Sequence, residues 1–216
     1  MARRLMVLSA QPGKLRPVAK LYFRYGTMDS AKTLNLLAVA HNYRSQGKRV
    51  VLVKPGLDDR FGEGLIASRA GLEARADILI GPQTVLAPDQ FAGVDCILVD
   101  EAQFLSPEII DALRRITISP GVPVICYGLR TDFRTKLFPG AQRLMEIADA
   151  LEEIKVTCVR CHRKATCNLR LIDGVAAVEG PQVMLGGNEH YVPVCWSHYD
   201  ELTTAARVQL SLPAAG

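Results

Sequence analysis

Short apolar segments alternate with helix-length segments through the first two thirds of the chain, and this alternation constrains the fold more than any other feature. Strands rich in apolar residues are predicted at 21–25, 50–53, 78–80, 96–99 and 123–127. Helices are predicted at 31–46, 107–117 and 141–151. Strands that alternate with helices form βαβ units. The sequence therefore predicts an α/β fold in which helices flank a mostly parallel sheet.

The chain changes character after about residue 152. Strands are predicted at 155–158 and 165–172, and several glycines break the remainder into turns. A module of roughly 45 residues buries too little apolar surface to fold alone. We therefore expect this part to carry a metal ion or to pack against the first domain.

Composition and charge exclude several classes of protein. No apolar run reaches the roughly 20 residues that span a bilayer, and the N-terminal residues lack a signal-peptide cleavage pattern. The net charge of +4 comes from scattered Lys and Arg residues, so neither a nucleic acid nor a membrane is required as a partner. Cys96 and Cys126 lie within predicted strands, where reduced cysteine packs as a small apolar residue. We expect a cytoplasmic protein.

A phosphate-binding loop is predicted where the first strand meets the first helix. Its residues are Gly26, Thr27, Met28, Asp29, Ser30, Ala31, Lys32 and Thr33. Backbone amides and a helix N-terminus face the anion in such a loop, Lys32 would contact the β- and γ-phosphates of ATP, and Thr33 would bind Mg²⁺. The usual pattern has glycine in place of Ala31, whose side chain is tolerable if its φ angle is negative. The alternative is an ordinary helix with a lysine in its first turn.

Two adjacent carboxylates, Asp100 and Glu101, follow the fourth predicted strand. Ligands of open α/β sheets bind at the carboxyl ends of the strands. Successive side chains of an extended chain point to opposite sides, so Asp100 is predicted to hold Mg²⁺ while Glu101 faces the substrate. A carboxylate beside a phosphate site can accept the proton of an attacking hydroxyl. For Glu101 alone, a solvated acidic turn is the alternative.

Two Cys/His pairs in the turn-rich part predict a structural zinc site. Cys158 and Cys161 form one pair, and Cys195 and His198 form the other, each with two intervening residues. This spacing lets each pair hold one side of a tetrahedral Zn²⁺. Substitute ligands are Cys167, His162 and His190. The alternative is a set of unrelated core thiols with a chance histidine.

Several further residues are weaker candidates for the same site. Arg60, which follows the second strand, could clamp the transferring phosphate, or it could belong to a turn with a salt bridge. Leu129 and Phe133, after the fifth strand, could sandwich a flat base or simply pack in the core. Met28 could contact a ligand or fill a gap.

Together these motifs resemble the zinc-containing, cytosolic type of thymidine kinase, found in many bacteria and in animals. The resemblance spans about residues 19–199. It rests on the shared order and spacing of the phosphate loop, Asp100 to Phe104, Tyr127 to Arg134, the two Cys/His pairs, and Gly186 to Cys195.

The resemblance implies transfer of the γ-phosphate of ATP to the 5′-hydroxyl of thymidine, as part of nucleoside salvage for DNA synthesis. The implied ATP site comprises the loop from Gly26 to Thr33 with Asp100, Glu101, Ala102 and Gln103. Glu101 would be the proton acceptor, while Lys32 and Arg60 would stabilise the transferring phosphoryl group. The implied thymidine pocket comprises Met28, Leu129, Phe133 and Tyr191, the last contributing partly through backbone groups. A homotetramer and feedback inhibition by thymidine triphosphate (dTTP) are also expected.

The chain would then have four parts. We expect an N-terminal extension at 1–17, a P-loop kinase domain at 18–151, a zinc-binding lasso at 152–200 that closes over the nucleoside, and a tail at 201–216. We call residues 152–200 the C-terminal module. The first 17 residues have no counterpart in short family members, so we expect them to be disordered or untranslated, with Val18 as the natural start.

Two other functions are compatible with parts of this pattern. A helicase-like ATPase also combines a phosphate loop with Asp-Glu-Ala-Gln, although the short chain and modest charge disfavour it. A non-catalytic zinc protein that binds a nucleotide as a regulator is the other alternative, suggested by Ala31.

Overall fold

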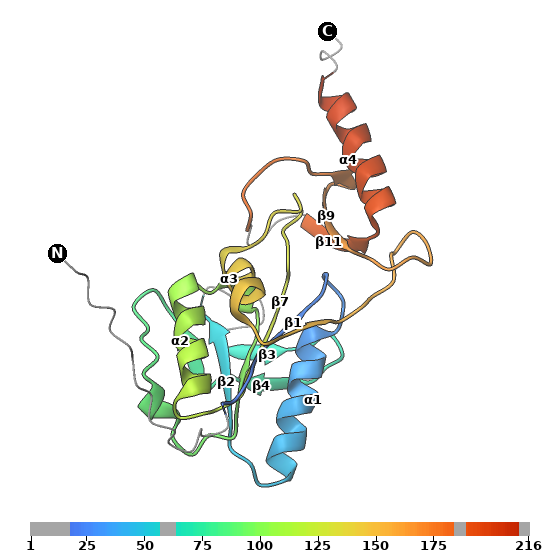
Figure 1. Cartoon of the computed structure of the whole chain (residues 1–216). Helices are drawn as coiled ribbons and strands as arrows, with labels where there is room; N and C mark the ends of the chain where they lie inside the picture. Colours follow the sequence, from blue (N-terminus) through green and yellow to red (C-terminus); the bar gives the residue numbers. More distant parts are fainter. Residues whose placement is uncertain (1–17, 57–63, 184–188, 212–216) are drawn as a thin grey trace, which may run out of the picture.

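The computed structural model describes residues 18–56, 64–183 and 189–211, which form a large α/β part and a smaller sheet (Figure 1). Within these residues the large part contains six parallel strands in the order β5-β2-β6-β7-β1-β8. The strands are β1 (Leu21–Tyr25), β2 (Val50–Pro55), β5 (Ile78–Ile80), β6 (Cys96–Val99), β7 (Val124–Gly128) and β8 (Ala150–Glu153). The predicted fold class is confirmed.

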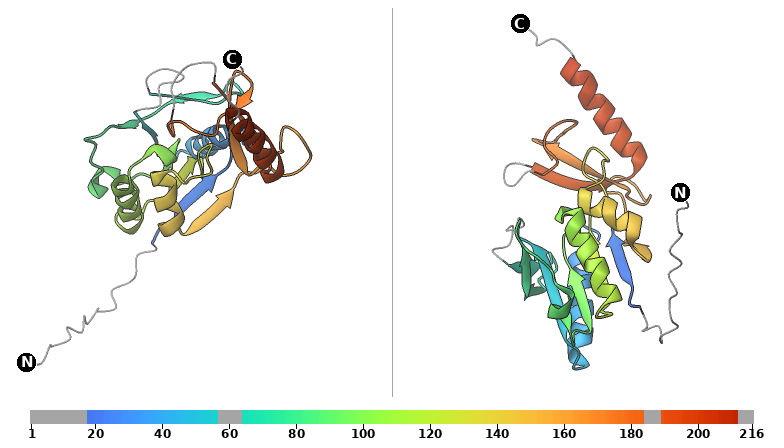
Figure 2. Two further views of the ribbon diagram at one scale, coloured as in Figure 1. Left: turned by 90° about the horizontal axis from the view of Figure 1, so that it is seen from above. Right: turned by 60° about the vertical axis from the view of Figure 1, so that its left-hand side comes forward.

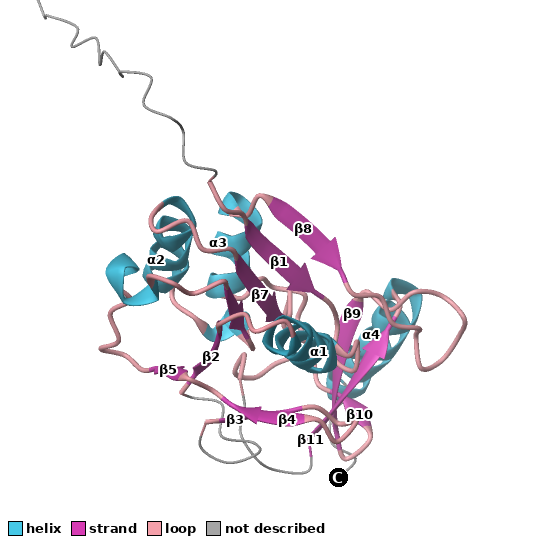
Figure 3. Cartoon of the chain, turned by 90° about the horizontal axis from the view of Figure 1, so that it is seen from below, coloured by secondary structure: helices cyan, strands magenta, loops and turns pink. Residues whose placement is uncertain are grey.

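Helices cover both faces of this sheet. They are α1 (Lys32–Ser45), α2 (Pro107–Ile118) and α3 (Pro139–Ile147). Leu36 of α1 packs in the core cluster on one face, whereas Leu113 of α2 and Leu144 of α3 pack in the cluster on the other. Strands β2, β6 and β7 are buried along their whole length, as expected for a sheet covered on both sides. Figure 3 shows β8 at one edge of the sheet and β5 at the other.

The third predicted helix is only partly correct. The helix ends at Ile147, and residues 150–153 form strand β8, which pairs in parallel with β1. Ala-Leu-Glu-Glu has good helix propensity, but the open edge of β1 offers a full set of backbone hydrogen bonds. Tertiary pairing therefore overrides local preference here.

The C-terminal module forms a separate three-stranded sheet. Its strands are β9 (Cys167–Ile172), β10 (Val175–Ala176) and β11 (Glu189–Val194), in the order β10-β9-β11. Helix α4 (Trp196–Ser211) packs on this sheet through Tyr199 and Ala206 and projects away from the α/β part (Figure 2). The strand predicted at 155–158 is wrong, because only an isolated bridge joins Thr157 to Lys164.

A small antiparallel hairpin lies beside the main sheet. It consists of β3 (Leu65–Ala67) and β4 (Glu73–Arg75), which the sequence did not predict. Two short 3-10 helices, η1 (Pro88–Phe91) and η2 (Ala102–Phe104), connect other elements. Among the described helices, none combines the length and hydropathy required to cross a bilayer.

Candidate active site

The phosphate-binding loop connects β1 to α1, as predicted. Lys32 folds back across it, because its Nζ donates to the Thr27 carbonyl at 2.6 Å and to Ser30 Oγ at 3.3 Å. A Cβ at position 26 would lie 2.3 Å from Ser30 Oγ and 2.5 Å from the Ile154 carbonyl oxygen, so only glycine fits there. The result is a tight cradle at a helix N-terminus, the arrangement that binds phosphate.

Ala31 adopts a left-handed backbone conformation, with φ 59° and ψ 28°. The condition under which an alanine side chain is tolerable here, a negative φ, is therefore not met. A Cβ in this region clashes with the following carbonyl and costs about 1–2 kcal/mol. Ala31 thus keeps the backbone shape that glycine would supply, and the loop stores strain.

Replacing Ala31 with glycine should therefore stabilise the protein. We expect Ala31→Gly to raise the free energy of unfolding by about 1 kcal/mol, because the strain is removed. Ala38→Gly is the control, since Ala38 is exposed inside α1 and the substitution there should lower the free energy of unfolding by about 1 kcal/mol. Urea unfolding curves measure both effects. If both variants were destabilised equally, Ala31 would not be strained.

Thr33 and Asp100 meet where a magnesium ion was predicted. The Thr33 hydroxyl lies 3.3 Å from both carboxylate oxygens of Asp100, and Asp100 is buried at the end of β6. Carboxylate and hydroxyl oxygens are donors that suit Mg²⁺, which usually keeps several waters and few protein ligands. The residues present therefore fit the ion.

Glu101 points away from Asp100 and is held by a buried glutamine. Its backbone is left-handed, with φ 48°. Gln103, which is fully buried, donates from Nε2 to the Glu101 carboxylate and accepts from the Leu129 amide at 3.0 Å. A Cβ at Gly128 would lie 2.5 Å from Gln103 Oε1, so glycine is required beside it. Gln103 thereby fixes the orientation of Glu101.

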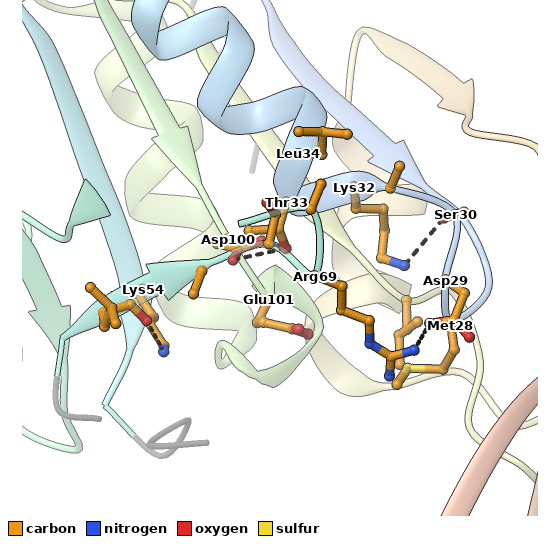
Figure 4. Close-up of a pocket in the computed structure, with 16 residues that line it drawn as sticks. Met28, Asp29, Ser30, Lys32, Thr33, Leu34, Lys54, Arg69, Asp100 and Glu101 are labelled. Carbon is orange, nitrogen blue, oxygen red and sulfur yellow. Dashed lines mark hydrogen bonds and ion pairs between the residues drawn. The ribbon is translucent and has the colours of Figure 1, made fainter. Parts of the chain in front are cut away.

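The phosphate loop, Asp100 and Glu101 line one cleft of about 250 Å³ (Figure 4). It is lined by Met28, Asp29, Ser30, Ala31, Lys32, Thr33, Leu34, Lys54, Leu65, Ala67, Ser68, Arg69, Ala70, Asp100, Glu101 and Leu129. Lys54 and Arg69 were not predicted. The sequence signal for Lys54 was a lysine at the end of an apolar strand; Arg69 carried no signal, because only the hairpin brings it here.

The remaining predicted nucleoside-binding residues lie outside the lining of this cleft. Phe133 is buried, with the Arg170 guanidinium 3.6 Å from its ring centroid. Tyr191 is half-buried on β11, opposite Arg170 in the register. Arg60 lies outside the described residues, as does the segment 1–17.

The C-terminal module contacts the phosphate loop through Asn168 of β9, which the sequence did not single out. The Met28 amide donates to Asn168 Oδ1 at 2.7 Å, and Asn168 Nδ2 donates to the Thr131 carbonyl at 3.0 Å. The Tyr199 hydroxyl donates to the Phe133 carbonyl at 2.7 Å. The module is therefore attached to both predicted substrate-binding segments.

The two Cys/His pairs converge as predicted. The ligand atoms of Cys158, Cys161, Cys195 and His198 all lie within 4.8 Å of one another. His198 Nδ1 is 3.4 Å from Sγ of both Cys158 and Cys195, and Sγ of Cys161 is 3.8 Å from that of Cys195. Tetrahedral zinc with usual bond lengths separates its ligand atoms by roughly 3.5–3.8 Å. The cluster could therefore hold zinc.

The thiol chemistry of this cluster also suits a metal. Burial opposes ionisation of Cys158, but hydrogen bonds with the backbone at Cys195 and Arg160 outweigh it and lower the pKa of Cys158 to about 6. Thiolates are the form that binds metal. Cys167, a possible substitute ligand, is buried in the same core as Cys158 but is not part of this Cys/His group.

Comparisons with known proteins agree with this geometry. The family model described as thymidine kinase matches residues 19–199. The thymidine kinase of Lactococcus lactis subsp. lactis (strain IL1403) is 45% identical over 184 residues, which cover 84% of this chain and 97% of that protein. That of Enterococcus faecalis is 47% identical over 184 residues, with 84% and 95% covered. That of Ruegeria pomeroyi is 46% identical over 191 residues, with 86% and 96% covered.

Among solved structures, the Pif1 helicase from Candida albicans aligns with 63% of this chain and 36% of its own, at 11% identity and a TM-score of 0.39. This likeness is too weak to bear on function. The family model and the relatives, by contrast, cover nearly all the described residues. The chain belongs to the thymidine kinase family.

Proposed function

We propose that this protein is an ATP-dependent kinase that transfers the γ-phosphate of ATP to the 5′-hydroxyl of thymidine, forming dTMP and ADP. The observation that carries the proposal is the single cleft that collects the phosphate loop, the Thr33–Asp100 pair and Glu101. Family membership supports thymidine as the acceptor.

The chemistry follows from positioning and charge. Lys32 and the amides of the loop stabilise the charge on the transferring phosphoryl group. Thr33 and Asp100 hold Mg²⁺, which supplies further charge neutralisation when bound. Glu101, oriented by Gln103, accepts the proton of the 5′-hydroxyl. Arg60 provides an additional cation.

The nucleoside is bound beside Glu101. Met28 and Leu129, which line the cleft, contact it together with Phe133 and Tyr191. Backbone groups near Tyr191 read the edge of the base, because fixed amides lose little entropy on binding. A snug space for the 5-methyl group contributes only about 1–3 kcal/mol. Deoxyuridine is therefore a poorer substrate and is not excluded.

The other parts have supporting roles. The kinase domain, expected at 18–151, includes all of β8 and so extends to Glu153. The C-terminal module forms a lasso over the nucleoside that zinc stabilises. The tail expected at 201–216 begins inside α4, which packs on this module through Ala206. The enzyme is a cytoplasmic homotetramer, inhibited by dTTP, which occupies the nucleoside and phosphate sites together. The resemblance to the family supports these assignments.

The first experiment measures ADP release from Mg-ATP with separate acceptors. Thymidine should drive stoichiometric turnover, whereas deoxycytidine, deoxyadenosine, single-stranded DNA and no acceptor should give only background. Turnover driven by DNA would instead identify a helicase-like ATPase. Tight ATP binding without turnover would identify a nucleotide-binding regulator.

A further inference from the structure

The cleft contains a cation opposite the phosphate loop that no motif accounts for. Arg69 lies between β3 and β4, and its side chain reaches across to pair with Asp29 of the loop. Figure 4 shows the Arg69 side chain directed toward Asp29. Arg69 therefore approaches the same space as Lys32 from the opposite wall.

The β3–β4 hairpin, which carries Arg69, is attached to the main sheet. Lys54 is only 1% exposed, and its Nζ donates to the Leu65 carbonyl of β3 at 2.7 Å. Leu65 and Ala67 of the same strand line the cleft. The hydrogen bond of Lys54 joins the hairpin to β2.

The positive and negative side chains of the described residues that line the cleft are equal in number. Its described lining holds three cationic side chains and three carboxylates, namely Lys32, Lys54, Arg69, Asp29, Asp100 and Glu101. Mg-ATP still carries net negative charge. A cationic side chain of the cleft would therefore favour ATP binding if it left its carboxylate partner and contacted the phosphate oxygens.

Arg69 is the cation best suited to such an exchange. Its side chain is 66% exposed and that of Asp29 is 35% exposed, and ion pairs at exposed positions contribute little. Arginine hydrogen bonds to phosphate are charge-assisted and often bidentate, and so are stronger.

We propose that Arg69 is a phosphate-binding residue that leaves Asp29 to contact the triphosphate of ATP from the hairpin side of the cleft. This inference rests on the proposed kinase function. Asp29 then acts as the partner that holds Arg69 at the cleft while no nucleotide is bound.

The test compares Arg69→Gln with Arg75→Gln. Arg75 is exposed on β4 of the same hairpin and does not line the cleft, so it controls for a general loss of positive charge. We expect Arg69→Gln to raise the KM for ATP about tenfold, the usual loss for a charged hydrogen bond, while the KM for thymidine stays constant. Arg75→Gln should match the wild type. Calorimetric titration with ATP alone should show the same loss of affinity.

Asp29→Asn separates direct phosphate contact from simple support of the loop. Asn tolerates the left-handed conformation of Asp29, whose φ is 60°. If Arg69 binds phosphate, this variant should lower the KM for ATP about twofold, since the competing carboxylate is gone. If Arg69 only supports the shape of the phosphate loop through Asp29, Arg69→Gln and Asp29→Asn should raise the KM for ATP equally, and the proposal is wrong.

Different results would overturn the proposed function and the role of Arg69. Wild-type protein that does not phosphorylate thymidine would overturn the proposed function. Wild-type turnover combined with an unchanged KM for ATP in Arg69→Gln would overturn only the role of Arg69.

Discussion

Glu101→Gln is expected to reduce kcat by a factor of about 10² to 10⁴, the usual contribution of a general base. The amide has nearly the same shape as the carboxylate but cannot accept the proton of the 5′-hydroxyl. Glu101 is half-buried at the cleft, so folding and ATP binding should persist. Steady-state kinetics with thymidine, together with calorimetric ATP titration, measure both quantities.

Two further variants make this prediction specific. Glu73→Gln removes an exposed carboxylate on β4, away from the cleft, and should leave kcat unchanged. Glu101→Asp keeps a carboxylate but shortens the side chain by one methylene, which moves the base away from the 5′-hydroxyl. Its kcat should therefore lie between those of the wild type and Glu101→Gln. If Glu101→Gln retained wild-type kcat, Glu101 could not be the base.

Loss of the zinc ligands should produce the largest effect on stability. Binding of structural zinc is worth about 10–16 kcal/mol in small zinc domains, and the C-terminal module has only a small core around Leu169 and Val194. We expect Cys158→Ser to lose bound zinc and the β9–β11 sheet to become sensitive to protease. Elemental analysis and limited proteolysis measure these changes.

The matched control is Cys167→Ala. Cys167 lies on β9 in the same core but outside the Cys/His cluster, so this variant should keep its zinc. ATP binding should be weakened in Cys158→Ser but not lost, because the phosphate loop loses its contact with Asn168 while the six-stranded sheet keeps its separate core clusters. Thymidine phosphorylation should be lost, since Asn168 and Tyr199 no longer hold their partners. Unchanged zinc content in Cys158→Ser would show that the ligand set is wrong.

Local spacing explains why much of the site could be predicted. Lys32 and Thr33 follow a strand and open a helix, and Asp100 ends a strand of the same sheet. Parallel strands bring their carboxyl ends to one edge, so Thr33 and Asp100 could be predicted to lie at the same edge, where the structure brings them together. The two intervening residues in each Cys/His pair likewise predict a tetrahedral metal site.

The features that escaped prediction depend on contacts between distant segments. Strand β8 exists because the edge of β1 was open, which a helix-favouring sequence does not reveal. Arg69 reaches the cleft only through the β3–β4 hairpin, and Arg170 stacks on Phe133 from another sheet. The backbone of Ala31 is set by the demands of the loop, against the preference of its own side chain.

Under the proposed kinase function, the two hydrogen bonds of Asn168 couple the binding of ATP to that of thymidine. One amide side chain holds both the Met28 amide of the phosphate loop and the Thr131 carbonyl beside the predicted nucleoside pocket. A ligand that orders either segment therefore lowers the entropy cost of ordering the other. Thermodynamic linkage makes such a relation mutual: thymidine must tighten ATP binding by the same factor by which ATP tightens that of thymidine.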